Sequence, residues 1–376
     1  MFNKTNKEPI YFITGGGTGG HIYPAVSIIR SLLDSNIKNE NIYYIGNEKN
    51  LENEIAQKNG FNFLSHSAYG MPRKISFQLL HWFFALLIAT IKTFGHFIKY
   101  KPSVIFATGG YICAPVLFCA KLLNIPYVLH DCDIHPGIVT RFFAPGAKSV
   151  SLSFESAKKY INSKNIFING NPIRQEFKTI SKKQAREELS LNDNFTILIM
   201  GGSLGAKTIN DSSFEILRNY ANKDGYTIIW QTGKKNFDEV MQKVLKEFEQ
   251  LPHNLVLQPY YDKMHLALLS ADVAISRAGS LSLSEICASS LPSILIPYPF
   301  AAADHQKKNA QSMVENNMAL MLEDKNCNNE TLFKMLEDLI NNKKLLSDLS
   351  YNAYKNAKLD SAEKIVEQIN NAIQKK

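Results

Sequence analysis

Three glycine- or serine-rich segments carry residue types that bind phosphate groups. The first has five glycines around Thr18, from Gly15 to Gly20, and is followed by His21. Glycines allow close backbone approach, and free N–H groups at a following helix start attract an anion. The spacing also fits the G-x-G-x-x-G dinucleotide fingerprint. A nicotinamide site would need an acid where the chain has Gly46-Asn47-Glu48, so this fit is imperfect.

The second segment, residues 201–208, reads Gly-Gly-Ser-Leu-Gly-Ala-Lys-Thr and resembles a Walker A loop. Ala206 stands where the glycine before Lys-Thr belongs, which argues against a nucleoside triphosphatase. A glycine turn between a strand and a helix still presents N–H donors to a phosphate, and Ser203 adds a hydroxyl.

The third segment, residues 276–285, follows an expected strand and opens a helix. Ser280 and Ser282 lie near the expected helix start, where donors converge. The carboxylate of Glu285 could accept two sugar hydroxyls and so hold a ribose. The alternative is a glutamate that only complements the helix dipole.

Two other polar segments follow expected strands. Residues 130–135 read His-Asp-Cys-Asp-Ile-His, but no zinc-site spacing supports a metal there, and a strand-end active-site loop is favoured. Residues 304–306, Asp-His-Gln, form a second such loop, whose amide and imidazole could bind a polar ligand or simply be solvated.

Short apolar strands alternate with helices in two successive series, which predicts two Rossmann-like domains of α/β class. The series restarts near residue 171. The expected strands are 10–13, 42–45, 104–107, 127–130 and 149–151, then 195–200, 227–230, 255–257, 273–275 and 293–296. The expected helices include 24–33, with Pro24 in its first turn, 114–123 and 182–189.

Length and composition indicate an ordinary globular chain. The chain has 376 residues, of which 45% are hydrophobic and 20% charged. Five cysteines without a CxxC pair favour a reducing compartment, and the N-terminus lacks the apolar region of a signal peptide. The net charge of +8 lies entirely in residues 1–173, with 17 Lys and Arg against nine Asp and Glu. This asymmetry indicates an anionic partner, or serves solubility alone.

One apolar segment, residues 75–98, could be mistaken for a membrane span. Its longest uninterrupted apolar stretch, from Trp82 to Ile91, is half the length that a spanning helix needs. We therefore expect a helix or helical hairpin that is buried or lies on a membrane surface.

Together these motifs closely resemble the MurG family of peptidoglycan glycosyltransferases. The matching segments are 16–24, 108–112, 170–174, 201–206, 276–285 and 304–310, in the family's order. The resemblance implies a GT-B fold, two Rossmann-like domains facing each other across a cleft. It implies a domain of residues 1–173 that binds acceptor and membrane, a UDP-sugar-binding domain of residues 174–356, and a last helix, about 357–376, that packs back on the first domain.

The implied reaction is inverting transfer of N-acetylglucosamine from its UDP donor. The acceptor is the 4-hydroxyl of the muramyl unit of undecaprenyl-pyrophosphoryl-muramyl-pentapeptide. The resemblance implies a peripheral enzyme on the cytoplasmic face of the plasma membrane, with no cofactor, no metal and no nucleic acid, beside other cell-wall synthesis proteins. The apolar segment and the basic first half would then share one explanation, docking on an anionic bilayer.

Matching motif positions imply a role for each site residue. His21 is the first candidate for the catalytic base. Asp131 is the second candidate, or it is the residue that orients the histidine. Arg174 and Ser203 would lie near the diphosphate or sugar, Tyr261 near uracil, Glu285 on the ribose and Gln306 on the sugar hydroxyls. The remaining implied substrate-binding residues are Thr18, Gly19, Gly20, Tyr111, Asp133, Ser280, Leu281, Ser282, Leu283 and Ser284.

One segment departs from the family pattern. Family members commonly have His-Glu-Gln-Asn where this chain has His-Asp-Cys-Asp at residues 130–133. Asp133 replaces an asparagine that contacts the sugar in the family, and a carboxylate cannot donate as an amide does.

Three other functions remain open at this level. Another GT-B enzyme, such as a UDP-sugar 2-epimerase or a transferase with a soluble acceptor, would keep the nucleotide site without the membrane surface. A nicotinamide dehydrogenase would use the first glycine cluster alone. A non-catalytic membrane scaffold with a decayed site would account for Asp133.

Overall fold

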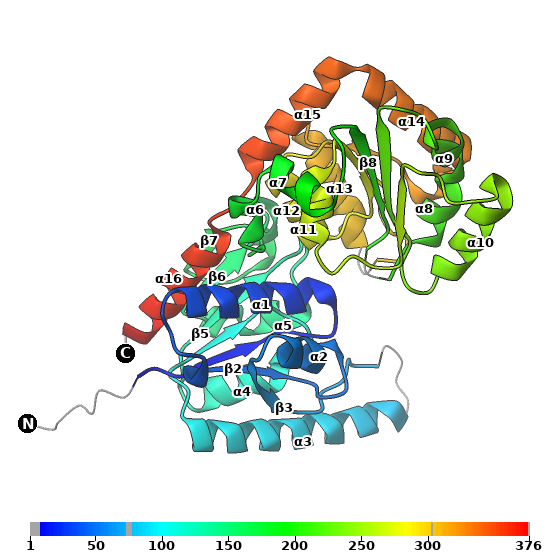
Figure 1. Ribbon diagram of the computed structural model, residues 1–376. Helices are drawn as coiled ribbons and strands as arrows, with labels where there is room; N and C mark the ends of the chain where they lie inside the picture. Colours follow the sequence, from blue (N-terminus) through cyan, green and yellow to red (C-terminus); the bar gives the residue numbers. More distant parts are fainter. Residues whose placement is uncertain (1–7, 73–76, 203, 302–303, 375–376) are drawn as a thin grey trace, which may run out of the picture. The chain divides into compact units, whose positions relative to one another are not determined.

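The computed structural model describes residues 8–72, 77–202, 204–301 and 304–374 and shows two α/β units (Figure 1). One compact unit consists of the residues up to Ile173 together with those from Asp360 onward. The other runs from Arg174 to Leu359. Each unit has its own parallel sheet.

The sheet of the first unit has seven parallel strands in the order β3-β2-β1-β4-β5-β6-β7. Its central strands are apolar and buried on both faces, which is typical of a parallel sheet covered by helices. The strands are β1 (Tyr11–Thr14), β2 (Ile42–Gly46), β3 (Asn62–Ser65), β4 (Val104–Ala107), β5 (Tyr127–Asp131), β6 (Ser149–Leu152) and β7 (Ile166–Ile168).

Helices cover both faces of this sheet. On one face, apolar residues of α1 (Gly19–Asp34), α2 (Leu51–Lys58) and α16 (Ser361–Gln374) pack in one core cluster with β1, β2 and β4. On the other face, a second cluster joins α3 (Phe77–Tyr100), α4 (Cys113–Leu122) and α5 (Ile138–Phe143) to the strands. The last helix of the chain is therefore part of the core of the first unit (Figure 1).

The second unit has a six-stranded parallel sheet in the order β10-β9-β8-β11-β12-β13. The strands are β8 (Phe195–Met200), β9 (Tyr226–Gln231), β10 (Leu255–Gln258), β11 (Val273–Ser276), β12 (Ser293–Leu295) and β13 (Leu320–Met321). Its helices are α6 (Glu176–Thr179), α7 (Lys182–Glu188), α8 (Lys207–Ser212), α9 (Phe214–Tyr220), α10 (Phe237–Phe248), α11 (Met264–Ser270), α12 (Ser280–Ala288), α13 (His305–Glu315), α14 (Asn329–Asn341) and α15 (Lys343–Asn356). Apolar residues of α8, α9, α10, α14 and α15 form one core cluster with the sheet, and α11 packs against β8, α7 and α12.

One local prediction differs from the structure, and a second, which left alternatives open, is narrowed by it. Helix α1 begins at Gly19, not near Pro24, so that proline lies in the second helical turn and His21 in the first. The helix starts earlier because Thr18 already accepts backbone hydrogen bonds from His21 and Ile22. The apolar segment is one continuous helix, α3, not a hairpin and not buried: only Ala89, Thr93 and Phe97 are fully enclosed.

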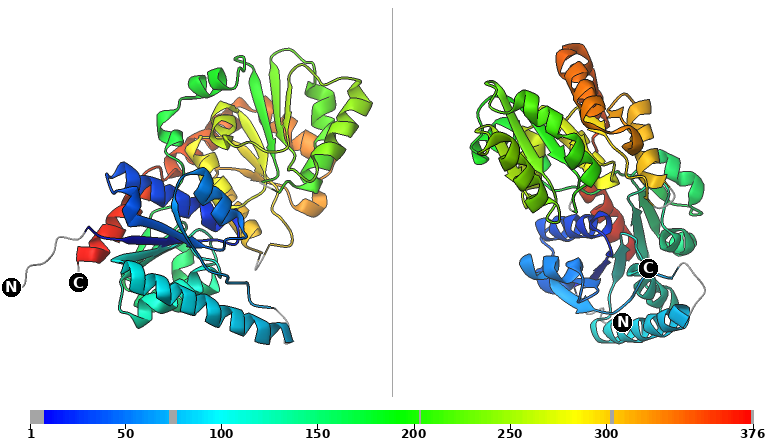
Figure 2. Two further views of the ribbon diagram at one scale, coloured as in Figure 1. Left: turned by 60° about the horizontal axis from the view of Figure 1, so that its bottom comes forward. Right: turned by 90° about the vertical axis from the view of Figure 1, so that its right-hand side faces the viewer.

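Helix α3 runs along the outer side of the first unit, as two views show (Figure 2). By length and composition it is the one helix among the described residues that could cross a membrane. Its inner side is attached to the domain, because Lys92 donates to the Ser65 hydroxyl at 2.8 Å and the ring of His96 contacts the Ser65 carbonyl at 3.2 Å. Large apolar side chains on its outer side, including Phe84, Ile88 and Ile91, are more than half exposed.

Candidate active site

In the first unit, the predicted catalytic residues lie at the carboxyl ends of two central strands that are separated by one strand. His21 is in the first turn of α1, directly after β1, and Asp131 is the last residue of β5. Thr108 follows β4, which lies between these two strands in the sheet. The chain order reverses between β1 and β4, and ligands of open α/β sheets bind at such a switch point.

The imidazole of His21 is held in one orientation. Its Nδ1 lies 2.9 Å from the Thr108 carbonyl oxygen. Because a carbonyl can only accept, Nδ1 is the donor, and the neutral ring then carries its lone pair on Nε2. The ring also packs on bare backbone: a Cβ at Gly109 or Gly110 would lie 3.2 Å from ring atoms of His21. This geometry gives His21 the tautomer that a general base requires.

Asp131 is almost fully enclosed and uses both carboxylate oxygens within its own loop. Oδ1 accepts from the N–H of Asp133 at 3.2 Å, and Oδ2 accepts from Gly137 at 3.0 Å. Burial raises the pKa of this carboxyl, while hydrogen bonding from Thr140 and the nearby His21 act in the opposite direction. The arrangement suits a residue that shapes the loop after β5 and contributes negative charge near His21.

The first glycine cluster does not present all of its amides to a ligand. The N–H of Gly17 points inward and donates to Oε1 of Glu52 at 2.7 Å. Thr18 is the N-cap of α1, and Gly19 and Gly20 form the start of the helix, so the N–H groups available to an anion begin there. Tyr111 lies over Gly17, where a Cβ would come within 2.8 Å of its ring.

Asp131, Cys132 and Asp133 bring three possible metal-ligand atoms within 4.8 Å of one another. Both carboxylate oxygens of Asp131 already accept loop N–H groups, and Cys132 Sγ lies 4.0 Å from His21 Nδ1. His130 faces elsewhere, toward Ser151 and Asn171, and burial lowers its pKa to about 4. Asp131, Cys132 and Asp133 are therefore part of the loop beside His21.

In the second unit, the second glycine cluster and the Tyr261 loop are joined by one side chain. Gln231, the last residue of β9, donates to the Gly202 carbonyl at 3.0 Å and accepts from the N–H of Tyr261 at 2.9 Å. The phenol of Tyr261 donates to the carbonyl of Val256, and burial raises the pKa of Tyr261. Ser203 lies outside the described residues.

The serine-rich segment forms the N-terminus of α12, after β11, with Gly279 as its N-cap. Ser280 and Leu283 are buried, whereas Leu281, Ser282 and Ser284 are partly exposed, and Ser284 donates to the Ser280 carbonyl. The free N–H groups at this helix start favour an anion.

Glu285 lies in the second turn of α12 and is partly exposed as a residue. Burial raises the pKa of its carboxyl to about 7, and the positive charge of Arg174 lowers it in part. Arg174 also donates to the Asp262 carbonyl at 3.1 Å. A carboxyl whose pKa is raised toward neutral pH close to a helix start that follows a strand is a candidate for ligand binding.

Helix α13 braces the turn between β11 and α12. Oε1 of Gln306 accepts from the N–H groups of Ala278 and Tyr298, and Asn309 donates to the Ala278 carbonyl at 3.1 Å. Beneath the turn, buried Arg277 donates to the Ile296 and Pro297 carbonyls and pairs with Asp324. Gln306 therefore lies close to the start of α12, although its oxygen serves the protein's own backbone.

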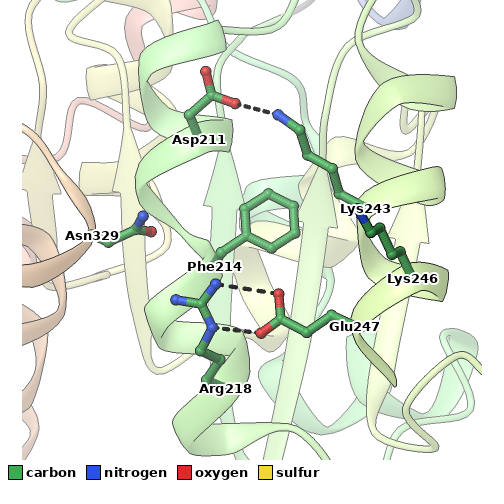
Figure 3. A pocket seen from close by; sticks show the side chains of 7 residues that line it. All are labelled: Asp211, Phe214, Arg218, Lys243, Lys246, Glu247 and Asn329. Atoms are coloured by element: carbon green, nitrogen blue, oxygen red, sulfur yellow. Dashed lines mark hydrogen bonds and ion pairs between the residues drawn. The ribbon is translucent and has the colours of Figure 1, made fainter. Parts of the chain in front are cut away.

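A pocket of about 570 Å³ opens elsewhere on the second unit, between α8, α9 and α10 (Figure 3). Four of its charged groups form ion pairs: Lys243 with Asp211 at 3.0 Å, and Arg218 with Glu247. The lining residues are Asp211, Phe214, Arg218, Lys243, Lys246, Glu247 and Asn329. These residues lie on helices, not on the loops after the strands, so the pocket is separate from both strand-end sites.

Comparison with known sequences now gives the family. Residues 11–152 match the glycosyltransferase family 28 N-terminal domain, and residues 196–369 match the family 28 C-terminal domain. The chain belongs to glycosyltransferase family 28. It is a glycosyltransferase, and the family resemblance predicted from the motifs is confirmed.

The sequence similarity to curated relatives covers nearly the whole length of this chain. A Desulforamulus reducens protein is 36% identical over 347 residues, covering 91% of this chain and 93% of its own length. A Halothermothrix orenii protein is 38% identical over 351 residues, covering 90% and 92%. Both are named UDP-N-acetylglucosamine–N-acetylmuramyl-(pentapeptide) pyrophosphoryl-undecaprenol N-acetylglucosamine transferase.

Solved structures show the same fold at lower identity. MurG from Acinetobacter baumannii aligns with a TM-score of 0.75 at 22% identity, over 97% of this chain and all of that one. A UDP-GlcNAc 2-epimerase from Neisseria meningitidis, solved with UDP-GlcNAc, aligns at 0.67 and 12% identity, over 96% and 100%. The predicted GT-B fold class is confirmed, and the fold alone does not separate transferases from epimerases.

Sequence reasoning missed three residues that organise these sites. Glu52, Gln231 and Asn309 each bind backbone of a loop distant in sequence. No motif surrounds Glu52 or Gln231, whereas Asn309 lay inside a matched segment without a role.

Proposed function

We propose that this protein transfers N-acetylglucosamine from UDP-N-acetylglucosamine to the muramyl 4-hydroxyl of a polyprenyl-pyrophosphoryl-muramyl-pentapeptide, with inversion at the anomeric carbon. The observation that carries the proposal is the relationship to transferases of that name, at 36–38% identity over nine-tenths of the chain. The neutral His21 tautomer with a lone pair on Nε2 supports it, because attack by a hydroxyl needs a base.

We propose His21 as the general base and Asp131 as the residue that positions its surroundings. His21 Nε2 is the ring atom left without a bond to Thr108, so it can take the acceptor proton. Both oxygens of Asp131 are engaged by loop N–H groups, which leaves this buried carboxylate poorly suited to contact a sugar hydroxyl. Thr18, Gly19, Gly20 and Tyr111 would complete the first-unit site.

We propose that the second unit, residues 174–359, holds the donor nucleotide. Glu285 would accept ribose hydroxyls, Tyr261 would lie by the uracil, and Gln306 by the sugar. The α12 N-terminus, with Ser280 to Ser284, and Arg174 would stabilise the departing diphosphate through N–H groups and positive charge. Ser203 is assigned to the same nucleotide site from its motif alone.

Asp133 bears on donor choice. Its N–H donates to Asp131, which ties this residue to the loop beside His21. We propose that its carboxylate takes the position of the family's asparagine toward the sugar, with weaker selection for the acetamido group because it cannot donate.

We propose that the first unit docks on the cytoplasmic face of the plasma membrane through α3. The outer side of the helix exposes Phe84, Ile88 and Ile91, and Lys99 lies near the end of the same helix. No Asp or Glu occurs in the sequence between Glu54 and Asp131, so this region carries only positive formal charge. An apolar, basic helix surface binds anionic bilayers. Other cell-wall synthesis proteins are proposed partners on the resemblance alone.

The deciding experiment measures transfer of labelled N-acetylglucosamine to a short-chain analogue of the lipid acceptor, with UDP release followed in parallel. Labelled lipid together with stoichiometric UDP supports the proposal. UDP release without labelled lipid would contradict the acceptor assignment. Donor epimerisation without transfer would favour the epimerase alternative, and folded protein with neither reaction would overturn the proposal.

A further inference from the structure

A buried carboxylate lies directly beneath the first glycine cluster. Glu52 is in the first turn of α2 and has no exposed surface, and it lies outside the segments that carried the family resemblance. Glutamate is among the residues least often fully buried without a partner, because removing a carboxylate from water is costly. Such a burial calls for a specific contact that the side chain makes.

That contact is with the glycine loop. Oε1 of Glu52 accepts the N–H of Gly17 at 2.7 Å, across a separation of 35 residues. The approach needs glycines on both sides: a Cβ at Gly16 would lie 2.0 Å from Oε1, and one at Gly46 would lie 3.0 Å from the Glu52 Cβ. Gly17 itself has φ +86°, a conformation that favours glycine.

Other groups hold the same loop from different directions. The phenol of Tyr44 donates to the Gly15 carbonyl at 2.7 Å, and the ring of Tyr111 covers Gly17. Glu52 supplies the acceptor for the last loop amide before Thr18, the N-cap of α1, with His21 three residues further on. The Glu52 contact therefore holds the loop residue that directly precedes the N-cap of α1.

We propose that Glu52 is a positioning residue for the transfer reaction, acting through the Gly17 amide on Thr18 and His21. This inference rests on the proposed function. Loss of the acceptor leaves a buried N–H unpaired, so the loop shifts or admits water. Small misplacements of a catalytic group can reduce turnover by about 100-fold. The order of the loop at Gly17 therefore affects kcat more than it affects donor binding.

The test compares two substitutions. Glu52→Ala removes the acceptor together with the side chain beyond Cβ, whereas Glu52→Gln keeps the size of the side chain and an oxygen that can accept from Gly17, removes the charge and replaces the other oxygen by an amide NH2. We expect Glu52→Ala to lower kcat at least ten-fold while the KM for UDP-N-acetylglucosamine changes less than two-fold. We expect Glu52→Gln to retain kcat within three-fold of the wild type.

Amide hydrogen exchange provides a readout that needs no substrate. In Glu52→Ala, exchange of the Gly17 amide is expected to accelerate at least ten-fold, with little change in Glu52→Gln. Glu54→Gln, at an exposed position of the same helix, controls for charge. Ala56→Gly, at a buried position of α2 away from the loop, controls for lost stability.

Three results would overturn the inference. The first is a kcat of Glu52→Ala within two-fold of the wild type. The second is a decrease in kcat of Glu52→Ala no larger than that of Ala56→Gly, when the two variants have the same thermal stability. The third is Glu52→Gln failing as severely as Glu52→Ala, which would make the charge and not the acceptor the cause. A wild-type protein without transferase activity would contradict the proposed function, while the exchange result would still test the Glu52 contact.

Discussion

His21 and Thr108 hold each other through two reciprocal hydrogen bonds. The Thr108 carbonyl accepts the Nδ1 proton of His21 at 2.9 Å, and the Thr108 hydroxyl donates to the His21 carbonyl at 2.6 Å. One residue opens α1 and the other follows β4, so the pair connects two neighbouring strand ends. The imidazole is thereby fixed in tautomer and orientation before any substrate binds.

Replacing His21 by Gln removes the proposed base while keeping a polar side chain. We expect kcat to fall by about 10²- to 10⁴-fold, the usual range for general base catalysis, with little change in the KM for the donor. Steady-state transfer kinetics provide the measurement. Asp131→Asn is the comparison: it should lose less activity and also lower the melting temperature, because its loop loses an acceptor. The reverse ranking at unchanged stability would make Asp131 the base.

Glu285 should make donor binding depend on pH. Its pKa is about 7 because the carboxyl is buried, so the ionised form that accepts two ribose hydroxyls is depleted below neutral pH. We expect UDP affinity to fall as the pH is lowered from 8 to 6, and this dependence to disappear in Glu285→Gln. Calorimetric titration with UDP across that range is the measurement; an unchanged pH dependence in the variant would exclude Glu285 as its source.

The raised pKa of Glu285 also predicts how the stability of the protein depends on pH. This dependence has the opposite sign to that of an ion-paired carboxylate, whose pKa is lowered. Between pH 4.5 and about 7 the folded state keeps a proton that the unfolded state releases, so stability falls as the pH rises through this window. The upper limit is about 3 kcal/mol, at about 1.4 kcal/mol per pKa unit. Without ligand, Glu285→Gln should therefore be less sensitive to pH between 5 and 8 in thermal unfolding.

Asp133→Asn restores the amide that the resemblance places against the sugar. A net hydrogen bond is worth about 1 kcal/mol, so we expect the preference for UDP-N-acetylglucosamine over UDP-glucose to rise by about five-fold. Competition between the two donors measures this ratio directly. A ratio that stays the same, or falls, would show that Asp133 does not contact the acetamido group.

Ile88→Glu on α3 should weaken membrane binding without affecting the chemistry. Ile88 is 64% exposed, and burying such a side chain contributes about 1.5–3 kcal/mol, so partitioning onto anionic vesicles should fall about ten-fold or more. Transfer to a short-chain soluble acceptor should remain within two-fold. The matched control is Tyr351→Glu on α15, at 63% exposure in the second unit. Equal loss of binding in both variants would argue against α3 as the docking surface.

Two ion pairs in the second unit should differ sharply in their contribution to stability. Arg277 and Asp324 are 11% and 17% exposed, and Arg277 also donates to two carbonyls. Arg277→Ala should therefore lower the free energy of unfolding by about 3–5 kcal/mol. Lys243→Ala, which breaks pairs with Asp211 and Glu239 at 42–50% exposure, should cost far less. Denaturant unfolding measures both, and similar losses would contradict the burial argument.

Several features could be predicted from the sequence because they depend on neighbours along the chain. The central strands are short apolar runs that end at glycine turns, and this pattern alone indicates two parallel α/β domains. The predicted strand 195–200 agrees with β8 residue for residue. Strands β3, β7 and β13 were missed, because each has only two to four residues and so gives too short an apolar run.

Helix α3 is a case in which the local sequence pattern could not predict the packing of a segment. Its sequence allowed a buried helix, a hairpin or a surface helix, and only packing decided between them. The side that carries Ala89, Thr93 and Phe97 is covered by the domain, and the outer side is left to solvent.

The sequence by itself determined the family, the GT-B fold class and the candidate residues, because motif order and strand–helix alternation are properties of the chain in one dimension. Only the tertiary structure decided which nitrogen of His21 is free, that both oxygens of Asp131 are occupied, and that the Gly17 amide points inward to Glu52. Each of these depends on a hydrogen bond between residues that are distant in sequence or set in a particular turn. Their partners are chosen by how strands and loops meet at the edge of a sheet, and no local spacing encodes that choice.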